Sequence, residues 1–228
     1  METPQEPHSV GRRALHESNP GLVSPEPGEG AETGTTVVGV VADEGVVLAA
    51  DRRASIGGRV VTNKHVRKVE SVHPTAAAAL SGTVGHLQQF VRVLRAETRL
   101  YADRRGTDPS MTALSTLAGN VLRNSGLQVS PLLGGVDDTG GYVFEIDGAG
   151  GVLRDTYAAG GSGMQLAYGA LEDTYRGDLT TEDARSVAAS AVGSASERDT
   201  ASGNGVAVAT VTQEDVQVEE YADPGEVA

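Results

Sequence analysis

The sequence predicts an α+β protein built as a four-layer αββα sandwich, in which two antiparallel sheets stack face to face and a helix pair covers each outer side. The first observation is the order of the segments, which is strands, two helices, strands, two helices and a final pair of strands. The second is that the first two strands, residues 37–42 and 46–51, are apolar on both faces, as in a sheet that is covered on both sides. Consecutive amphipathic helices are typical of a layer over a sheet.

Turn residues separate the strands of the first half. Asp43-Glu44-Gly45 joins the first two strands as a hairpin. Gly57-Gly58 turns the chain again, and the residues that follow, 59–70, predict a second hairpin. Residues 75–81 then predict a strand of small residues, which ends at Gly82.

Helices and further strands follow in the predicted order. Apolar residues recur at spacings of three and four in four segments, and Ser110 is placed to cap the second of them. These predicted helices span residues 84–101, 111–122, 165–175 and 181–196. Apolar runs bounded by turn residues predict the remaining strands, at residues 131–136, 142–146, 151–157, 205–212 and 216–221.

The start of the domain is also the first candidate site. Residues 1–34 contain five of the nine prolines and no periodic apolar pattern, so we expect a disordered leader before one domain, 35–228, with an acidic C-terminal tail. One interpretation is that a disordered tail simply ends where the domain begins. The other is that Gly34-Thr35 is a cleavage site and Thr35 becomes a new amino terminus. Its hydroxyl would be a nucleophile, and its own α-amine, with a pKa of about 8, would be the proton acceptor.

The amino-acid composition argues against several classes of function. The net charge of −13 argues against binding to the phosphates of a nucleic acid. The absence of cysteine excludes disulfides, thiolate zinc sites and a cysteine nucleophile, and it fits a cytoplasmic chain. No stretch approaches the ~18 apolar residues of a membrane span, and the leader lacks the apolar centre of a secretory signal. We therefore expect a protein that binds neither nucleic acid nor a membrane.

Two charged residues stand at the ends of predicted strands. Asp51 ends an apolar run, and we expect its carboxylate to be half buried and to need a cation, although a solvated charge at a strand end is the alternative. Strand parity places Lys68 on one face with Val66. Lys68 is then either an ordinary lysine of an edge strand or a cation that points inward.

Other catalytic sites fit the sequence poorly. The five histidines show no two-histidine helical spacing, and we expect no metal site and no cofactor. Gly160-Gly161-Ser162-Gly163 lacks the spacing of a serine-hydrolase elbow and of a dinucleotide fingerprint, so it predicts a tight turn from strand to helix. Asp138-Thr139-Gly140 matches the aspartic-protease triplet, but these residues are common in hairpin turns.

Several motifs taken together resemble the 20S proteasome β-subunit family of N-terminal-nucleophile (Ntn) hydrolases, and most closely its archaeal members. The resemblance covers residues 35–221, and it implies the Ntn-hydrolase αββα fold and a threonine-type endopeptidase that degrades unfolded proteins to peptides. The motifs are the Gly34-Thr35-Thr36 junction, Asp51 followed by Arg52, Lys68, Ser81-Gly82 with Val84-Gly85, Gly161-Ser162-Gly163, and Arg198-Asp199-Thr200-Ala201-Ser202-Gly203.

The resemblance also implies roles for these residues. Thr35 becomes the nucleophile after self-cleavage at Gly34-Thr35, Lys68 keeps a positive charge beside its hydroxyl, and Asp51 holds Lys68 in place. One extra residue within 57–63 relative to the usual spacing leaves Arg67 and Lys64 as alternatives to Lys68, which strand parity favours. The residues implied to position the amine and its water are Ser162, Asp199 and Ser202, and the N–H implied to meet the oxyanion is that of Gly82.

A substrate pocket and an assembly are implied in the same way. The mostly apolar pocket predicts a chymotrypsin-like preference for large apolar residues before the cut; it is formed by Ala54, Ser55, Val66, Leu80 and Val84. The implied partners are other β-subunits in a homo- or hetero-heptameric ring, α-subunit rings, a regulatory ATPase that feeds unfolded chains, and protein substrates. Two alternatives remain, a structural β-type subunit that assembles without cutting and a simpler bacterial peptidase ring with the same nucleophile.

Overall fold

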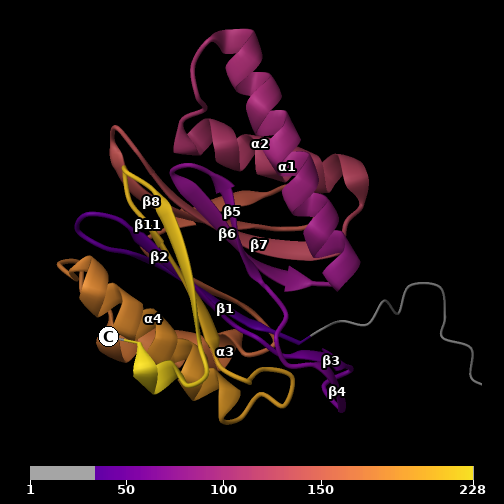
Figure 1. Cartoon of the computed structure of the whole chain (residues 1–228), viewed down its shortest axis with the longest axis vertical. Helices are drawn as coiled ribbons and strands as arrows, with labels where there is room; N and C mark the ends of the chain where they lie inside the picture. The colour runs from indigo at the N-terminus through magenta and orange to yellow at the C-terminus, as the bar shows by residue number, and fades with distance from the viewer. Residues whose placement is uncertain (1–33, 228) are drawn as a thin grey trace, which may run out of the picture. The chain divides into compact units, whose positions relative to one another are not determined.

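The computed structural model describes residues 34–227, and Figure 1 shows the arrangement of their elements. The leader that we expect to be disordered is residues 1–34, of which residues 1–33 lie outside the described residues. Within the described part, two five-stranded sheets have the orders β10-β1-β2-β11-β12 and β5-β6-β7-β8-β9, and β3-β4 forms a separate hairpin. The strands are β1 Thr36–Val41, β2 Val46–Asp51, β3 Ala54–Ile56, β4 Val60–Asn63, β5 Val69–His73, β6 Ala76–Gly82, β7 Val129–Asp137, β8 Gly140–Ile146, β9 Val152–Asp155, β10 Tyr157–Gly161, β11 Val206–Val211 and β12 Val216–Tyr221.

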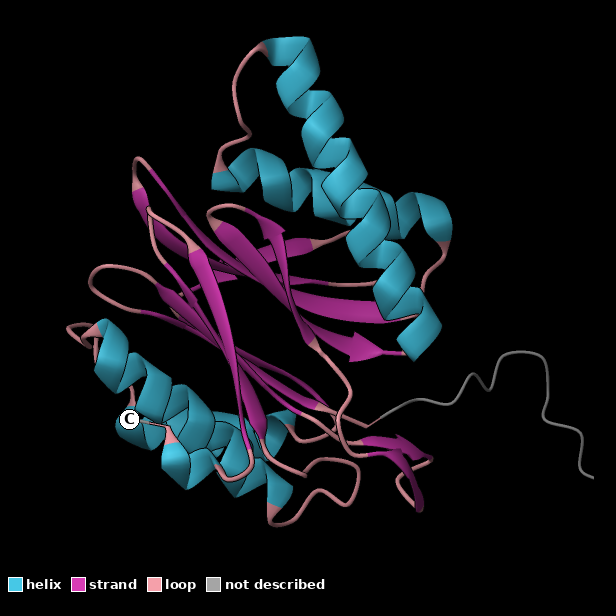
Figure 2. Ribbon diagram, viewed as in Figure 1, coloured by secondary structure: helices cyan, strands magenta, loops and turns pink. Residues whose placement is uncertain are grey.

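The helices cover the two outer faces of the sheets, as Figure 2 shows. Helices α1 (Val84–Arg105) and α2 (Met111–Ser125) pack on the sheet that contains β5 to β9. Helices α3 (Met164–Thr174) and α4 (Thr181–Ser196) pack on the sheet that contains β1. A third apolar layer fills the space between the sheets. The predicted α+β four-layer sandwich is therefore confirmed.

The alternation of side chains between the two faces of a strand explains why the β1–β2 hairpin lies at the centre of this stack. Successive side chains of a strand point to opposite faces. Val38 and Val40 of β1 face the α3–α4 layer, while Val37 packs with Leu48 and Leu132 between the sheets. Both faces of β1 are thus buried, as the continuous apolar runs predict.

Local capping fixes the helix ends that border this core. Ser110 caps α2 as predicted, because its side chain accepts a hydrogen bond of 3.3 Å from the Ala113 N–H. Gly126 ends α2 in the left-handed conformation with φ of 61°, which glycine adopts without strain. Thr180 caps α4 by accepting a 3.1 Å bond from the Asp183 N–H.

The hairpin predicted for residues 59–70 is wrong. The hairpin in this region is β3–β4, which ends at Asn63, and β5 begins at Val69 and pairs with β6 in a different sheet. The Asn63 side chain accepts a 2.7 Å hydrogen bond from the His65 N–H, which turns the chain out of the strand. Strand parity therefore does not govern the residues before Lys68.

The strand predicted for residues 151–157 corresponds to β9, Val152–Asp155, but it ends earlier than predicted, and the next strand, β10, was missed. The two strands lie on the edges of different sheets. The Asp155 side chain accepts a 2.7 Å bond from the Thr156 N–H and breaks the strand where the chain crosses between the sheets. The crossing brings Gly161, at the end of β10, opposite Thr36.

Antiparallel register brings the ends of several elements together at one edge. Thr36 starts β1 beside the end of β2, and Asp51 lies opposite Val206 at the start of β11. Gly161 closes β10 on the other side of β1. The loop from α4 to β11 must therefore end next to Asp51. This convergence places motifs that are far apart in the sequence around Thr35.

Candidate active site

Thr35 lies immediately before β1 in the intact chain and is buried. Its backbone N–H donates to the Ser162 Oγ at 3.0 Å, although the two residues are 127 positions apart. Its carbonyl accepts from the Gly163 N–H at 3.3 Å, so the turn from β10 to α3 holds Thr35 from one side. The predicted tight turn at Gly160–Gly163 thus contacts Thr35 at the junction with Gly34.

Lys68 and Asp51 form a buried ion pair on the other side of this junction. The Lys68 Nζ lies 2.7 Å from the Asp51 Oδ1, and the side chains are 1% and 0% exposed. The Asp51 carboxylate is thus fully buried rather than half buried as expected. Three backbone N–H groups also donate to it, from Thr36 at 3.0 Å, Arg53 at 3.0 Å and Gly203 at 2.9 Å, which compensates for its loss of water.

Burial lowers the pKa of Lys68 below its usual value near 10.5, and the attraction of Asp51 and Asp199 opposes this shift. The Lys68 Nζ also donates to the Gly34 carbonyl oxygen at 3.5 Å. Of the three cations considered for this place, Lys64 and Arg67 are exposed and Lys68 is buried. The structure therefore brings Lys68 to the junction, although the parity reasoning that favoured it fails.

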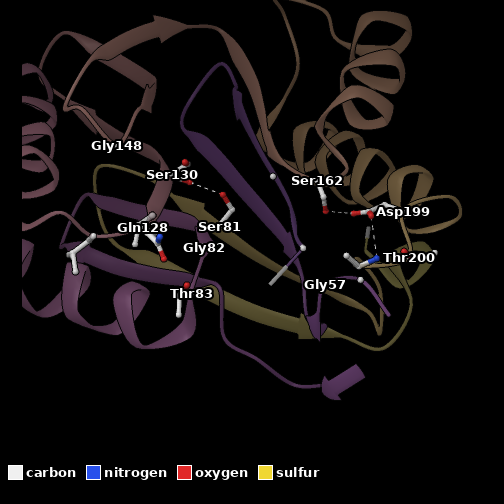
Figure 3. A pocket seen from close by; sticks show the side chains of 16 residues that line it. Gly57, Ser81, Gly82, Thr83, Gln128, Ser130, Gly148, Ser162, Asp199 and Thr200 are labelled. Atoms are coloured by element: carbon white, nitrogen blue, oxygen red, sulfur yellow. Dashed lines mark hydrogen bonds between the residues drawn. The ribbon is translucent and has the colours of Figure 1, made fainter. Parts of the chain in front are cut away.

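A chain of hydroxyl and carboxylate groups approaches the Thr35 nitrogen from the opposite direction. The Ser162 Oγ and the Ser202 Oγ each donate to the Asp199 Oδ2 at 2.6 Å. The Ser202 Oγ also lies 2.8 Å from the Thr36 Oγ1. In Figure 3 the Ser162 and Asp199 side chains point toward each other across the edge of the pocket. The structure thus brings all three predicted positioning residues together.

A cavity of about 790 Å³ opens beside this cluster. Gly34, Ser162 and Asp199 line one side of it, and Gly82 and Gln128 line another, as Figure 3 shows for the labelled residues. Gly82 has a φ of +135°, and a Cβ there would lie 2.2 Å from the Gln128 carbonyl oxygen. Only glycine fits this position without displacing backbone.

A second cavity of about 440 Å³ contains part of the predicted substrate pocket. Val66, Leu80 and Val84 line it. Ala54 and Ser55 are buried and are not among its lining residues.

The expectation of a mostly apolar wall is incomplete, because charged side chains line the same cavity. Glu70 and Arg95 form an ion pair of 3.2 Å there. His65, Arg67 and Arg92 also line this cavity. A side chain that enters it therefore meets both apolar and charged groups.

Sequence reasoning missed Arg53 as part of this site. Its Nε donates to the Asn204 Oδ1 at 2.9 Å and its Nη1 donates to the Thr200 carbonyl at 2.8 Å. It thereby joins the end of β2 to the loop that carries Asp199 and Ser202. Arg52 and Arg53 both follow Asp51 in the sequence, but which arginine side chain binds the loop depends on the path of the loop from α4.

Within residues 34–227, no cluster of three or more histidine, aspartate or glutamate side chains is arranged to hold a metal ion. No helix of the described part combines the length and apolar character needed to span a membrane. The groups gathered around Thr35 are a threonine hydroxyl, a buried ammonium–carboxylate pair and a serine–aspartate network.

Comparisons with known proteins agree with this arrangement. The family model described as "Proteasome subunit" matches residues 31–211. The chain is 52% identical over 221 residues to "Proteasome subunit beta" of Halorhabdus utahensis, covering 95% of this chain and 94% of that protein. It is 55% identical to "Proteasome subunit beta" of Natronomonas pharaonis, with 86% and 82% covered. It is 54% identical to "Proteasome subunit beta 1" of Haloarcula marismortui, with 83% and 80% covered. The chain therefore belongs to the proteasome β-subunit family, in its archaeal branch.

Proposed function

We propose that this chain is a catalytic β-subunit of the proteasome core particle, a threonine-type endopeptidase whose nucleophile is Thr35. The observation that carries the proposal is that Thr35 lies between two networks of polar side chains. The buried Lys68–Asp51 pair reaches the junction from one side, and Ser162 with Asp199 reaches the Thr35 nitrogen from the other. A hydroxyl nucleophile needs such a proton acceptor and a nearby cation.

The same groups support self-cleavage at Gly34-Thr35. The Thr35 Oγ adds to the carbonyl carbon of Gly34, the Gly34–Thr35 C–N bond breaks, and the hydroxyl proton ends on the Thr35 nitrogen. The product is an ester between Gly34 and the Thr35 Oγ together with a free Thr35 amine, and water hydrolyses the ester to a Gly34 carboxylate and the Thr35 hydroxyl. Lys68, 3.5 Å from the Gly34 oxygen, favours the negative charge that develops there. Residues 1–34 are then an autocatalytically removed propeptide.

In the mature subunit the free amine replaces the peptide nitrogen. The amine, directly or through water, accepts the Thr35 hydroxyl proton as the oxygen attacks a substrate carbonyl, and Ser162, Asp199 and Ser202 orient that amine. We assign the Gly82 N–H to the substrate oxyanion, because Gly82 and Gly34 line the same cavity. One such donor typically contributes ~3 kcal/mol to the transition state. The acyl ester formed on Thr35 is released by water.

We propose a preference for large apolar residues before the scissile bond. Val66, Leu80 and Val84 line a cavity of about 440 Å³, which provides apolar contact for an aromatic or branched side chain. Fluorogenic peptides that end in phenylalanine, arginine or glutamate test the preference. We expect the phenylalanine peptide to be cut fastest, and fastest cutting after glutamate would contradict the assignment.

We also propose how this subunit assembles with its partners. As a proteasome β-subunit, the chain belongs to a particle that also contains α-subunits, and we propose heptameric β-rings between α-rings, with a regulatory ATPase that delivers unfolded protein substrates. The cytoplasm is the proposed location. The net charge of −13 disfavours nucleic acid as a further partner.

One experiment separates the cutting subunit from a structural one. The full-length chain is co-assembled with its α partner, and its intact mass is measured for the wild type, Thr35→Ala and Thr116→Ala. Thr116 lies on α2 and is exposed, so it is the matched threonine control. We expect loss of residues 1–34 and peptide hydrolysis in the wild type and Thr116→Ala alone. Equal processing and activity in Thr35→Ala would refute the proposal.

A further inference from the structure

Gly34 is crowded on one side by the loop between α4 and β11. A Cβ built on Gly34 would lie 1.8 Å from the Cβ of Ala201 and 2.9 Å from the Ser162 Oγ. Carbon atoms in favourable contact are about 3.5–4.0 Å apart. A methyl group at residue 34 therefore cannot coexist with the Ala201 methyl in this arrangement.

We propose that Ala201 is the residue that restricts the position before Thr35 to glycine; this inference rests on the proposed self-cleavage. Ala201 is buried, and its N–H donates to the Asp199 Oδ1 at 3.2 Å. The preceding carbonyl, that of Thr200, is held by Arg53 at 2.8 Å. The loop is thus fixed on both sides of the contact, and the Ala201 methyl has little freedom to move away from residue 34.

The reacting carbonyl has equally little freedom to move the other way. Its oxygen lies 3.5 Å from the Lys68 Nζ, and the adjoining Thr35 nitrogen lies 3.0 Å from the Ser162 Oγ. A side chain at residue 34 pushes against Ala201 and displaces the carbonyl carbon from the Thr35 Oγ that must bond to it. The affected step is the addition of this oxygen to carbon, which precedes cleavage of the C–N bond.

The inference predicts compensation between two substitutions. Overpacking of a fixed site is costly, and we expect Gly34→Ala to slow leader removal about 10–100-fold. Ala201→Gly removes the opposing methyl, so the double variant Gly34→Ala/Ala201→Gly should recover at least about tenfold of the lost rate. Gly85→Ala is the control, because nothing lies within 4 Å of a Cβ at that position, and we expect the wild-type rate.

The readout is a time course of intact mass for the full-length chain co-assembled with its α partner. A double variant as slow as Gly34→Ala would overturn the inference, because glycine would then be needed for its backbone and not for space. A wild-type rate in Gly34→Ala would overturn it as well.

A second variant covers the case in which Ala201→Gly alone stops cleavage. Ala201→Val keeps Gly34 and adds bulk at the contact, so it must slow leader removal, and a wild-type rate would refute the role of Ala201. A wild-type chain that keeps residues 1–34 contradicts the proposed self-cleavage itself, which is a different outcome from any failure among the variants.

Discussion

The buried ion pair makes a quantitative prediction, because Asp51→Asn removes one charge and leaves the other. Lys68 is 1% exposed and lies 2.7 Å from the Asp51 Oδ1, so the variant holds a buried ammonium group with no carboxylate in contact with it. Removing one partner of a buried pair typically costs about 3–5 kcal/mol. The amide NH₂ of asparagine also replaces an oxygen that accepts backbone N–H groups, so some of these donors lose their acceptor.

The assay is urea unfolding of the full-length chain, followed by far-ultraviolet circular dichroism. Both the parent and the variant carry Thr35→Ala, so that leader removal cannot differ between them. We expect Asp51→Asn to lower the free energy of unfolding by about 3–5 kcal/mol. In the catalytically intact background, we expect kcat to fall about 10²-fold, because Lys68 is no longer held in place.

A matched control lies at the same end of β2. Arg52, whose side chain is 13% exposed, pairs with Glu220, whose side chain is 36% exposed, and ion pairs near the surface contribute about 1 kcal/mol or less. Glu220→Gln should therefore stay within about 1 kcal/mol of the parent. If Asp51→Asn costs no more than Glu220→Gln, the Lys68–Asp51 pair does not carry the energetic role assigned to it.

Three further predictions concern the surroundings of the site. Arg53→Lys keeps the charge but cannot reproduce both contacts to the loop at Thr200 and Asn204, so we expect kcat to fall about tenfold with KM unchanged. Arg52→Lys is the control and should keep the parental kcat. An equal loss of kcat in both variants would contradict this role of Arg53. Burial lowers the pKa of Lys68, so between that lowered value and 10.5 the unfolded chain binds more protons than the folded chain and stability rises with pH. Lys68→Met should flatten this rise in the free energy of unfolding just below pH 10.5, and an unchanged slope would refute the shift. Ser110→Ala should cost about 1 kcal/mol in urea unfolding through loss of the α2 cap, and no loss would show that water replaces the bond to Ala113.

Much of the fold followed from local patterns. The apolar runs of β1 and β2 and the three-and-four spacing of α1 to α4 depend on neighbours within a few residues, and these elements were predicted close to their observed bounds. The departures, at residues 59–70 and after residue 155, are segments where the chain leaves one sheet for another. Apolar residues stand before and after each crossing, while the Asn63 and Asp155 side chains end the strand.

The sequence by itself determined the element types, the layer order and the kinds of residues that gather at Thr35, because these depend on periodicity and on residue chemistry. Only the tertiary structure decided which lysine is buried, which arginine holds the loop, and that Ala201 faces Gly34. These contacts join residues far apart in the chain, such as Thr35 and Ser162 at a separation of 127. Their distances depend on sheet register and loop path, which no local pattern encodes.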